Sequence, residues 1–277
     1  MISRKLLGAV VGIVFGAVAL TPAAASAWAP AASATVTPGV QTFTAGGQCT
    51  ANFIFQDGGG VYIGQAAHCS GTGAQTDTNG CDTGSLPIGT PVEITGASNP
   101  GTLVYNSWIA MQAKGETNPD ACAFNDFALV RINPADVAKV NPSVPRFGGP
   151  TGLGGSAAGL GDTVYSYGNS SLRAGVTQLS PKQGIVVQGA GNGWSRTVYT
   201  VTPGVPGDSG SGFMDANGAA IGTLSTLAIA PVPASNGVGD LRNELNYMRA
   251  NSSFSGVSLV NGTEPFRPNL INAILGL

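Results

Sequence analysis

The chain has 277 residues, of which only 9% are charged, and its formal net charge at pH 7 is −2. Beyond Arg4 and Lys5 it has no cluster of lysine and arginine, which excludes a nucleic-acid-binding protein because phosphate binding depends on concentrated positive charge. The 42 glycines, with abundant alanine, serine and threonine, favour short strands and tight turns over long amphipathic helices.

The N-terminus has the three parts of a secretory signal peptide. Arg4 and Lys5 give a positive start, an apolar run extends from Leu6 to Leu20, and small residues follow up to Ala27. The alternative is a membrane anchor, but the run is shorter than the roughly 20 residues that a spanning helix needs. We therefore expect residues 1–27 to be removed on export, leaving a secreted, extracellular protein with no membrane association.

The rest of the chain predicts a succession of short strands. An arm at 28–44 leads into a first β-unit at 45–140, and a segment rich in proline, glycine and serine at 141–161 predicts a linker. A second β-unit at 162–250 and an extension at 251–277 follow. Strand candidates lie at 51–55, 61–65, 91–95, 103–113 and 127–132 before the linker, and at 163–167, 184–188, 197–202, 212–215 and 220–224 after it. Many short strands without intervening helices favour antiparallel barrels over a parallel α/β sheet.

One helix is expected near the end of the second unit. Asp240 is a favourable N-cap, and Leu241, Leu245 and Met248 follow at helical spacing on one face. This apolar face predicts a helix that closes the second barrel. The extension at 251–277 has no functional interpretation.

All four cysteines, Cys49, Cys69, Cys81 and Cys122, lie in the first half of the exported chain. An even number of cysteines in an exported protein predicts disulfides, whereas zinc is disfavoured because no pair has Cys-x-x-Cys spacing. Three pairings are possible. Folding the chain at the turn 57–60 places Cys49 opposite Cys69, which leaves Cys81 with Cys122.

The chain contains one histidine, His68, and a serine between glycines in Gly207-Asp208-Ser209-Gly210. A serine hydroxyl needs a nearby base to become a good nucleophile, and imidazole is the usual base. We therefore expect His68 to activate Ser209. The N–H groups of Gly207 and Ser209 are unobstructed and would bind a developing oxyanion.

An acid that orients the imidazole is expected at Asp126, which opens an apolar strand. A carboxylate at the mouth of a buried strand is costly unless it is paired, and a hydrogen bond to His68 would pair it. The competing acids are Asp120, Asp136 and Asp162, but none leads an apolar strand so directly.

The order His68, Asp126, Ser209 excludes the α/β-hydrolases, in which the histidine follows the serine. The single histidine also excludes metalloproteases of the His-Glu-x-x-His type. The three motifs resemble those of the chymotrypsin-like serine peptidases, especially their bacterial secreted branch, over residues 45–250. The resemblance implies an all-β fold of two antiparallel six-stranded β-barrels with a C-terminal helix and a catalytic cleft between the barrels. It implies the first of the two disulfides as well.

The sequence departs from the animal members of that family before the candidate nucleophile. No Ile-Val-Gly-Gly-like motif precedes Cys49, so Asp208 needs a partner other than a freed N-terminus. Bacterial relatives typically use an internal arginine, for which Arg173 is the first candidate and Arg131 the second. Backbone N–H groups are the alternative partner.

The resemblance also predicts the substrate-binding residues. It places the base of the primary pocket near Pro203 and the substrate-binding strand at Ser225, Thr226 and Leu227. No acid occupies the base, so a preference for arginine or lysine lacks its counter-charge. A bulky Leu227 would favour small or medium apolar side chains.

We therefore expect a secreted, monomeric serine endopeptidase that acts on polypeptides and needs no metal or organic cofactor. The alternatives are a non-catalytic secreted binding protein on the same fold and an esterase. Retention of all three triad residues argues against the binding protein. Comparing the turnover of peptides with that of simple esters would identify an esterase.

Overall fold

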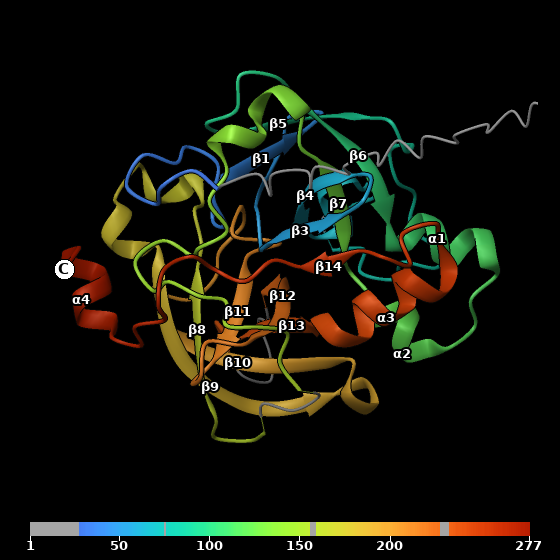
Figure 1. The fold of residues 1–277 in the computed structure, drawn as a ribbon. Helices are drawn as coiled ribbons and strands as arrows, with labels where there is room; N and C mark the ends of the chain where they lie inside the picture. The colour runs from blue at the N-terminus through green and yellow to red at the C-terminus, as the bar shows by residue number, and fades with distance from the viewer. Residues whose placement is uncertain (1–27, 75, 156–158, 228–232) are drawn as a thin grey trace, which may run out of the picture.

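The computed structural model describes residues 28–74, 76–155, 159–227 and 233–277, so the predicted signal peptide lies outside the described residues. The described chain is mainly β-structure in two halves (Figure 1). The strands are β1 (Gln41–Thr44), β2 (Gly47–Thr50), β3 (Ile54–Asp57), β4 (Gly60–Gln65), β5 (Pro91–Ile94), β6 (Gly101–Asn106), β7 (Ala128–Arg131), β8 (Thr163–Tyr167), β9 (Pro181–Ala190), β10 (Ser195–Val201), β11 (Gly212–Asp215), β12 (Ala220–Leu227), β13 (Asn236–Asp240) and β14 (Ser258–Leu259). The α-helices are α1 (Ser107–Lys114), α2 (Pro119–Phe124), α3 (Leu241–Asn251) and α4 (Leu270–Leu275). The 3-10 turns are η1 (Ala67–Ser70), η2 (Pro134–Lys139), η3 (Ser171–Arg173), η4 (Thr177–Leu179) and η5 (Gly191–Gly193).

The C-terminal half forms a closed antiparallel barrel of six strands in the order β10-β13-β12-β11-β8-β9. Its interior is filled by branched and aromatic side chains from every strand, which suit a pleated, buried surface. These are Val164, Val186, Val198, Phe213, Ile221, Leu224 and Val238. The predicted six-stranded barrel is confirmed for this half.

The N-terminal half differs from the expectation of a second six-stranded barrel. It is an open antiparallel sheet of eight strands in the order β14-β3-β4-β7-β6-β5-β1-β2. The predicted arm at 28–44 contributes β1, and the predicted extension at 251–277 contributes β14, which pairs with β3. At the other edge, β2 directs the Thr50 N–H to the Ser209 carbonyl in the C-terminal half, at 2.8 Å. That edge therefore joins the barrel half instead of closing the sheet on itself.

The strand predicted at 103–113 is wrong in its second part, because β6 stops at Asn106 and α1 begins. The Asn106 side-chain oxygen accepts hydrogen bonds from the Trp108 and Ile109 N–H groups at 2.8 and 3.3 Å, which caps the helix. Trp108 and Met111 lie almost one turn apart and are both buried. The residues from Trp108 to Met111 are all apolar, and such a short run also fits a buried strand, so the cap was the decisive signal.

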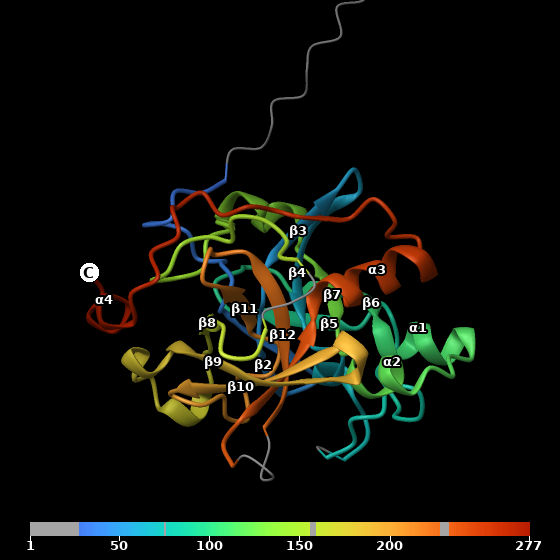
Figure 2. The same cartoon turned by 90° about the horizontal axis from the view of Figure 1, so that it is seen from below.

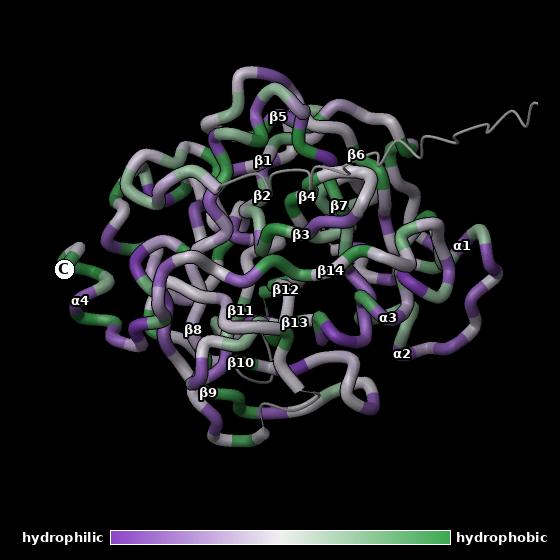
Figure 3. Tube along the Cα trace, in the orientation of Figure 1, coloured by the Kyte–Doolittle hydropathy of each residue, from purple (hydrophilic) through white to green (hydrophobic). Residues whose placement is uncertain are grey.

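The predicted C-terminal helix is confirmed as α3. The Asp240 carboxylate caps it by accepting a hydrogen bond from the Asn243 N–H at 2.9 Å, and Leu241, Leu245 and Met248 are buried. Hydrophobic and hydrophilic residues alternate along the helix (Figure 3). The buried face contacts β12 and β13 of the barrel and also α1 of the other half.

Beyond α3 the chain crosses the molecule to reach α4 at the far side (Figures 1 and 2). Val257 and Val260 are buried along this path, and the Phe254 ring packs edge-on against Tyr62 with centroids 5.7 Å apart. The extension therefore covers the first sheet.

The two halves share one hydrophobic core. Its members come from the first sheet, from the barrel and from α3, among them Phe53, Phe127, Met214 and Leu245. Within the described residues, no helix is both long and apolar enough to span a bilayer.

Candidate active site

His68 and Asp126 lie against each other at the junction of the two halves. The His68 Nδ1 atom lies 2.6 Å from Asp126 Oδ2, and the His68 backbone N–H donates to Asp126 Oδ1 at 2.9 Å. The Asp126 carboxylate is buried, while the imidazole is 28% exposed. Because the carboxylate accepts a hydrogen from Nδ1, the other ring nitrogen, Nε2, is left as the proton acceptor.

Ser225 completes the surroundings of this carboxylate. Its hydroxyl donates to Asp126 Oδ2 at 2.5 Å. Ser225, which the resemblance predicts on the substrate-binding strand, lies on β12 and turns its side chain toward Asp126. Three donors thus hold one carboxylate, which fixes the orientation of the His68 ring.

The charges of this pair stabilise each other. Burial disfavours the imidazolium, but the Asp126 charge and hydrogen bond outweigh burial and raise the pKa of His68 above 6.5. Burial likewise disfavours the Asp126 carboxylate, but His68 and the Ser225 hydroxyl outweigh it and lower the pKa of Asp126 below 3.8. The site therefore favours an ionised Asp126 and stabilises an imidazolium that forms during a reaction.

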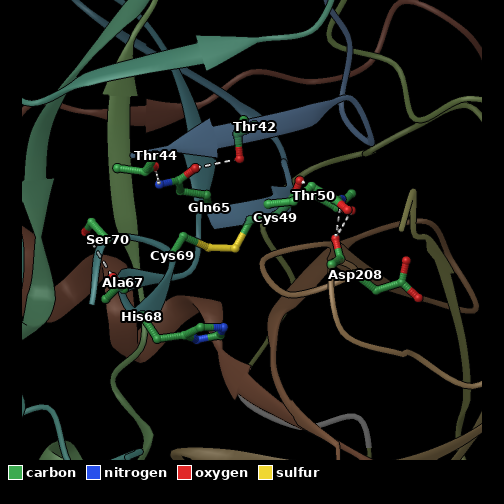
Figure 4. The surroundings of a disulfide bond; sticks show 12 residues. Thr42, Thr44, Cys49, Thr50, Gln65, Ala67, His68, Cys69, Ser70 and Asp208 are labelled. Carbon is green, nitrogen blue, oxygen red and sulfur yellow. Dashed lines mark hydrogen bonds between the residues drawn. A yellow bond between two sulfur atoms is a disulfide. The ribbon is translucent and has the colours of Figure 1, made fainter. Parts of the chain in front are cut away.

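His68 lies in the 3-10 turn η1, which is fastened at both sides. The neighbouring Cys69 forms a disulfide with Cys49 of β2 (Figure 4). The Asn106 amide group donates to the Ala67 carbonyl at 3.0 Å and so links the turn to the start of α1. This attachment restricts the imidazole to one place, as general-base catalysis requires.

Both predicted disulfides are present. Cys49 pairs with Cys69, and Cys81 pairs with Cys122. The first pair forms without the expected hairpin between its two strands. Cys49 lies in β2, which pairs with β1 and not with β4. The turn at Asp57 nevertheless folds β4 back onto β3, so that the chain reaches Cys69 close to Cys49.

The Ser209 loop packs against the same region from the barrel half. The Ser209 carbonyl accepts from Thr50 N, and the Gly207 carbonyl accepts from the Thr50 hydroxyl at 2.8 Å. At Gly210, where φ is +89°, an added Cβ would lie 2.8 Å from Ala66 N, so only glycine permits this approach. The Ser209 loop is therefore held within backbone contact of the segment that leads into His68.

Among the described residues, no hydrogen bond joins the Ser209 hydroxyl to the His68 ring. The structure brings the two segments together without forming this third contact. Catalytic hydrogen bonds are often long before substrate binds and shorten in the reacting complex.

The backbone before Ser209 presents free donors. Gly207 has φ +94°, a left-handed conformation in which an added Cβ would lie 2.6 Å from the Gln48 side-chain oxygen. Within the described part of the chain, neither the Gly207 N–H nor the Ser209 N–H donates a hydrogen bond. The two groups are therefore available to an oxygen atom of a ligand.

Asp208 is buried and has two cationic partners. Arg173, the first candidate from the sequence, forms an ion pair with it, and Lys182 lies 3.1 Å from the same carboxylate oxygen. The alternative was right as well, because the Ser170 N–H donates to Asp208 Oδ1 at 3.0 Å. Arg131 instead donates to a carbonyl in the β3–β4 turn. Asp208 thereby anchors the loop that carries Ser209.

A hollow of about 430 Å³ lies between the segment that leads to Ser209 and the end of β12. Pro203 and Leu227, the two ends of the predicted substrate-binding set, line it together with Gly204, Val205 and Arg173. Ser225 and Thr226 do not line it. A larger hollow of about 800 Å³ lies at the β1–β5 edge, and no triad residue lines it.

Solved structures of bacterial proteases share this architecture. Thermobifida fusca protease A matches with a TM-score of 0.52 and 19% identity, over 82% of this chain and 99% of its own. The chain has the chymotrypsin-like fold. A Nocardiopsis protease (18% identity) and a Cellulomonas bogoriensis chymotrypsin (17%) each match with a TM-score of 0.49, over 81% of this chain and 98% of their own. No protein-family model and no curated protein matches the sequence.

The chymotrypsin-like fold brings polar residues to the site that the sequence did not single out. Lys182 is wholly buried beside Asp208, and burial lowers its pKa to about 8 although the Asp208 charge opposes this. Asn236 is also buried and links the segment before Ser209 to β12, because its amide donates to the carbonyls of Gly204 and Thr226 at 3.1 and 3.2 Å. A buried lysine or asparagine on a strand has no local sequence signal, since its partners are distant in the chain.

Metal binding receives no support from the described residues. His68, Cys49 and Cys69 form the one group of potential ligands within 4.8 Å of one another. Both sulfur atoms belong to the disulfide, so neither is a thiolate that could bind a metal.

Proposed function

We propose that the chain is a secreted serine endopeptidase in which Ser209 is the nucleophile, His68 the general base and Asp126 the residue that orients His68. The observation that carries the proposal is the double hydrogen bond between Asp126 and His68, with the Ser209 loop packed against β2 and the segment that leads into His68. The chymotrypsin-like fold supports it independently.

In the proposed reaction the Ser209 oxygen attacks the carbonyl carbon of the scissile peptide bond while Nε2 of His68 takes the hydroxyl proton. The carbonyl oxygen becomes an oxyanion, which the N–H groups of Gly207 and Ser209 would bind. Collapse of the intermediate breaks the C–N bond, and His68 donates its proton to the leaving amine. Water then hydrolyses the acyl-enzyme by the same steps, with His68 again as base. No step requires a metal or an organic cofactor.

The hollow lined by Pro203 and Leu227 is the proposed primary pocket. Among the residues that the structure describes, no acidic side chain lines it, so a substrate arginine or lysine would enter without a counter-charge. The bulky Leu227 lines the hollow, which supports a preference for small or medium apolar side chains. Thr226 and Ser225 belong to the strand along which an extended polypeptide would bind.

Export is part of the proposal. Residues 1–27 carry the signal-peptide pattern, and the two disulfides fit an oxidising compartment. We propose that the exported protein acts as a monomer on polypeptides.

The test compares the wild-type protein with Ser209→Ala on a peptide library and on simple esters. The substitution removes only the attacking oxygen, so we expect peptide hydrolysis to fall by about 10^5-fold or more while the circular dichroism spectrum is unchanged. Undiminished hydrolysis by Ser209→Ala would overturn the assignment. Ester turnover without peptide turnover in the wild-type protein would make the chain an esterase.

A further inference from the structure

The triad leaves one buried titratable group at the site unexplained, the carboxyl of Glu244 on α3. Its side chain is wholly buried. Oε2 accepts a hydrogen bond from the Thr223 hydroxyl at 2.9 Å, and Oε1 accepts a longer one, 3.4 Å, from the Asp126 backbone N–H. The space is made by Gly239, where an added Cβ would lie 2.3 Å from Oε1. Glu244 thus lies directly behind the residue that orients His68.

No cation neutralises this carboxyl. Among the described residues, every ion pair involves an aspartate, and none reaches Glu244. Two further carboxylates face it, Asp126 before β7 and Asp240 at the end of β13. The phenol of Tyr105 on β6 is close enough to interact electrostatically with it. Burial, followed by the charge of Asp126, raises the pKa of Glu244 well above 4.5.

We propose that Glu244 is a positioning residue that acts through Asp126 as a neutral carboxylic acid. In this state Oε1 accepts from the Asp126 N–H and the acid proton lies on Oε2, 2.9 Å from the Thr223 hydroxyl oxygen, so Glu244 links the Asp126 backbone to α3 and, through Thr223, to β12. Its neutrality leaves Asp126 as the negative charge that acts on His68. The role in the reaction rests on the proposed function, whereas the neutrality and the anchoring do not.

The charge state of Glu244 affects how readily His68 accepts a proton. A second negative charge behind Asp126 would disfavour ionisation of Asp126 and would further stabilise the imidazolium of His68. A base that stays protonated at working pH cannot accept the serine proton. A neutral Glu244 supplies the hydrogen-bonding anchor without this effect.

The experiment uses the fact that the chain contains a single histidine, so one imidazole NMR signal reports the pKa of His68. Glu244→Gln keeps the size and the neutrality of the side chain. We expect the His68 pKa to stay within about 0.3 of the wild-type value and kcat/KM to stay within about threefold. Glu93→Gln, at an exposed site, is the matched control.

Glu244→Leu tests the anchoring, because it leaves the Thr223 hydroxyl and the Asp126 N–H without their partner. We expect kcat to fall by about tenfold, KM to stay unchanged and the His68 pKa to move. If this variant does not fold, Thr223→Val removes only the hydroxyl and should lower kcat in the same direction.

Two results would overturn the proposal. A fall of one unit or more in the His68 pKa in Glu244→Gln would mean that Glu244 carries a charge. Unchanged kcat and His68 pKa in a folded Glu244→Leu protein would mean that Glu244 positions nothing. Absence of any peptidase activity in the wild-type protein would overturn the proposed function, and the His68 titration would still decide the state of Glu244.

Discussion

At the scale of single residues, the site is organised around the Asp126 carboxylate. One of its oxygens accepts from the His68 backbone, and the other accepts from the His68 ring and from Ser225. Hydrogen bonds to an ionised group are about twice as strong as neutral ones, so this arrangement holds the ring in one tautomer. The orientation of His68 therefore depends on Asp126 more than on any other side chain.

Asp126→Asn tests that dependence. The amide can occupy the same space, but it carries no charge and can reverse the tautomer, so kcat is expected to fall by about 10^3- to 10^4-fold. The NMR-monitored pKa of His68 should also fall, because the group that raises it has lost its charge. An unchanged His68 pKa in the variant would contradict this account of the pair.

The pH dependence follows from the direction of the two shifts. The neutral imidazole is the base, so kcat/KM should rise with pH through a midpoint above 6.5. The folded protein binds the His68 proton more tightly than the unfolded chain, so this stabilisation is complete below about pH 6.5 and is lost as the pH rises through the folded-state pKa. For Asp126 the sign is opposite, and its contribution is lost only as the pH falls below 3.8. Urea unfolding at several pH values checks both signs.

At the scale of elements, the start of α1 supports the turn that carries His68. The Asn106 oxygen caps α1, while its amide nitrogen donates to the Ala67 carbonyl at 3.0 Å and to the Ser70 hydroxyl at 2.9 Å. One side chain thus serves both the helix and the turn η1.

Asn106→Asp separates these two tasks, because the carboxylate retains the capping oxygen but cannot donate to the η1 turn. We expect α1 to persist, the free energy of unfolding to fall by about 1–3 kcal/mol, and kcat to fall more than the loss of stability explains. Asn118→Asp, at the cap of α2, is the matched control and should leave kcat unchanged. Thermal unfolding and steady-state kinetics measure both effects. Equal kcat values in the two variants would show that Asn106 does not support η1.

The elements also show where sequence reasoning succeeds and fails. The helix α3 was predictable because Asp240 gives a local cap and the apolar spacing is unambiguous. The helix α1 was missed because its short, uniformly apolar run also suits a buried strand. The arm and the extension were not recognised as sources of β1 and β14, because short edge strands are specified by their partners and not by their own pattern.

Some residues of the candidate site could be predicted from the sequence and others could not. The positions of His68, Asp126 and the Ser209 loop follow from short motifs with fixed local chemistry, so the sequence located them together. Glu244 and Lys182 escaped notice because a buried ionisable residue is defined by neighbours that are remote in the chain. The partner of Asp208 was found only in part for the same reason.

At the scale of the whole molecule, the edge strand β2 of the first sheet connects the turn that carries His68 with the Ser209 loop of the barrel half. Cys49 of β2 is bonded to Cys69 beside His68, and the next residue, Thr50, holds the Ser209 loop (Figure 4). The Cys49–Cys69 bridge therefore fastens the strand that holds the Ser209 loop to the turn that carries His68. The Cys81–Cys122 bridge closes a longer loop away from Ser209.

Replacing each cysteine pair by alanine should separate these roles. Each loss is expected to lower the free energy of unfolding by about 2–4 kcal/mol, because the unfolded chain gains freedom. Only loss of the Cys49–Cys69 bridge should also lower kcat/KM under conditions in which the protein is fully folded. Chemical denaturation and kinetics on the two double variants measure this. Equal kinetic effects would contradict the proposed role of the Cys49–Cys69 bridge.

The central claim is that Ser209 is a nucleophile activated by His68. Labelling with a serine-directed fluorophosphonate, followed by mass mapping of the modified peptide, tests it most directly. We predict one adduct, on Ser209, that is lost in Ser209→Ala and strongly reduced in His68→Ala, with both variants folded. An adduct on another residue, or labelling of Ser209 at an undiminished rate in His68→Ala, would contradict the account.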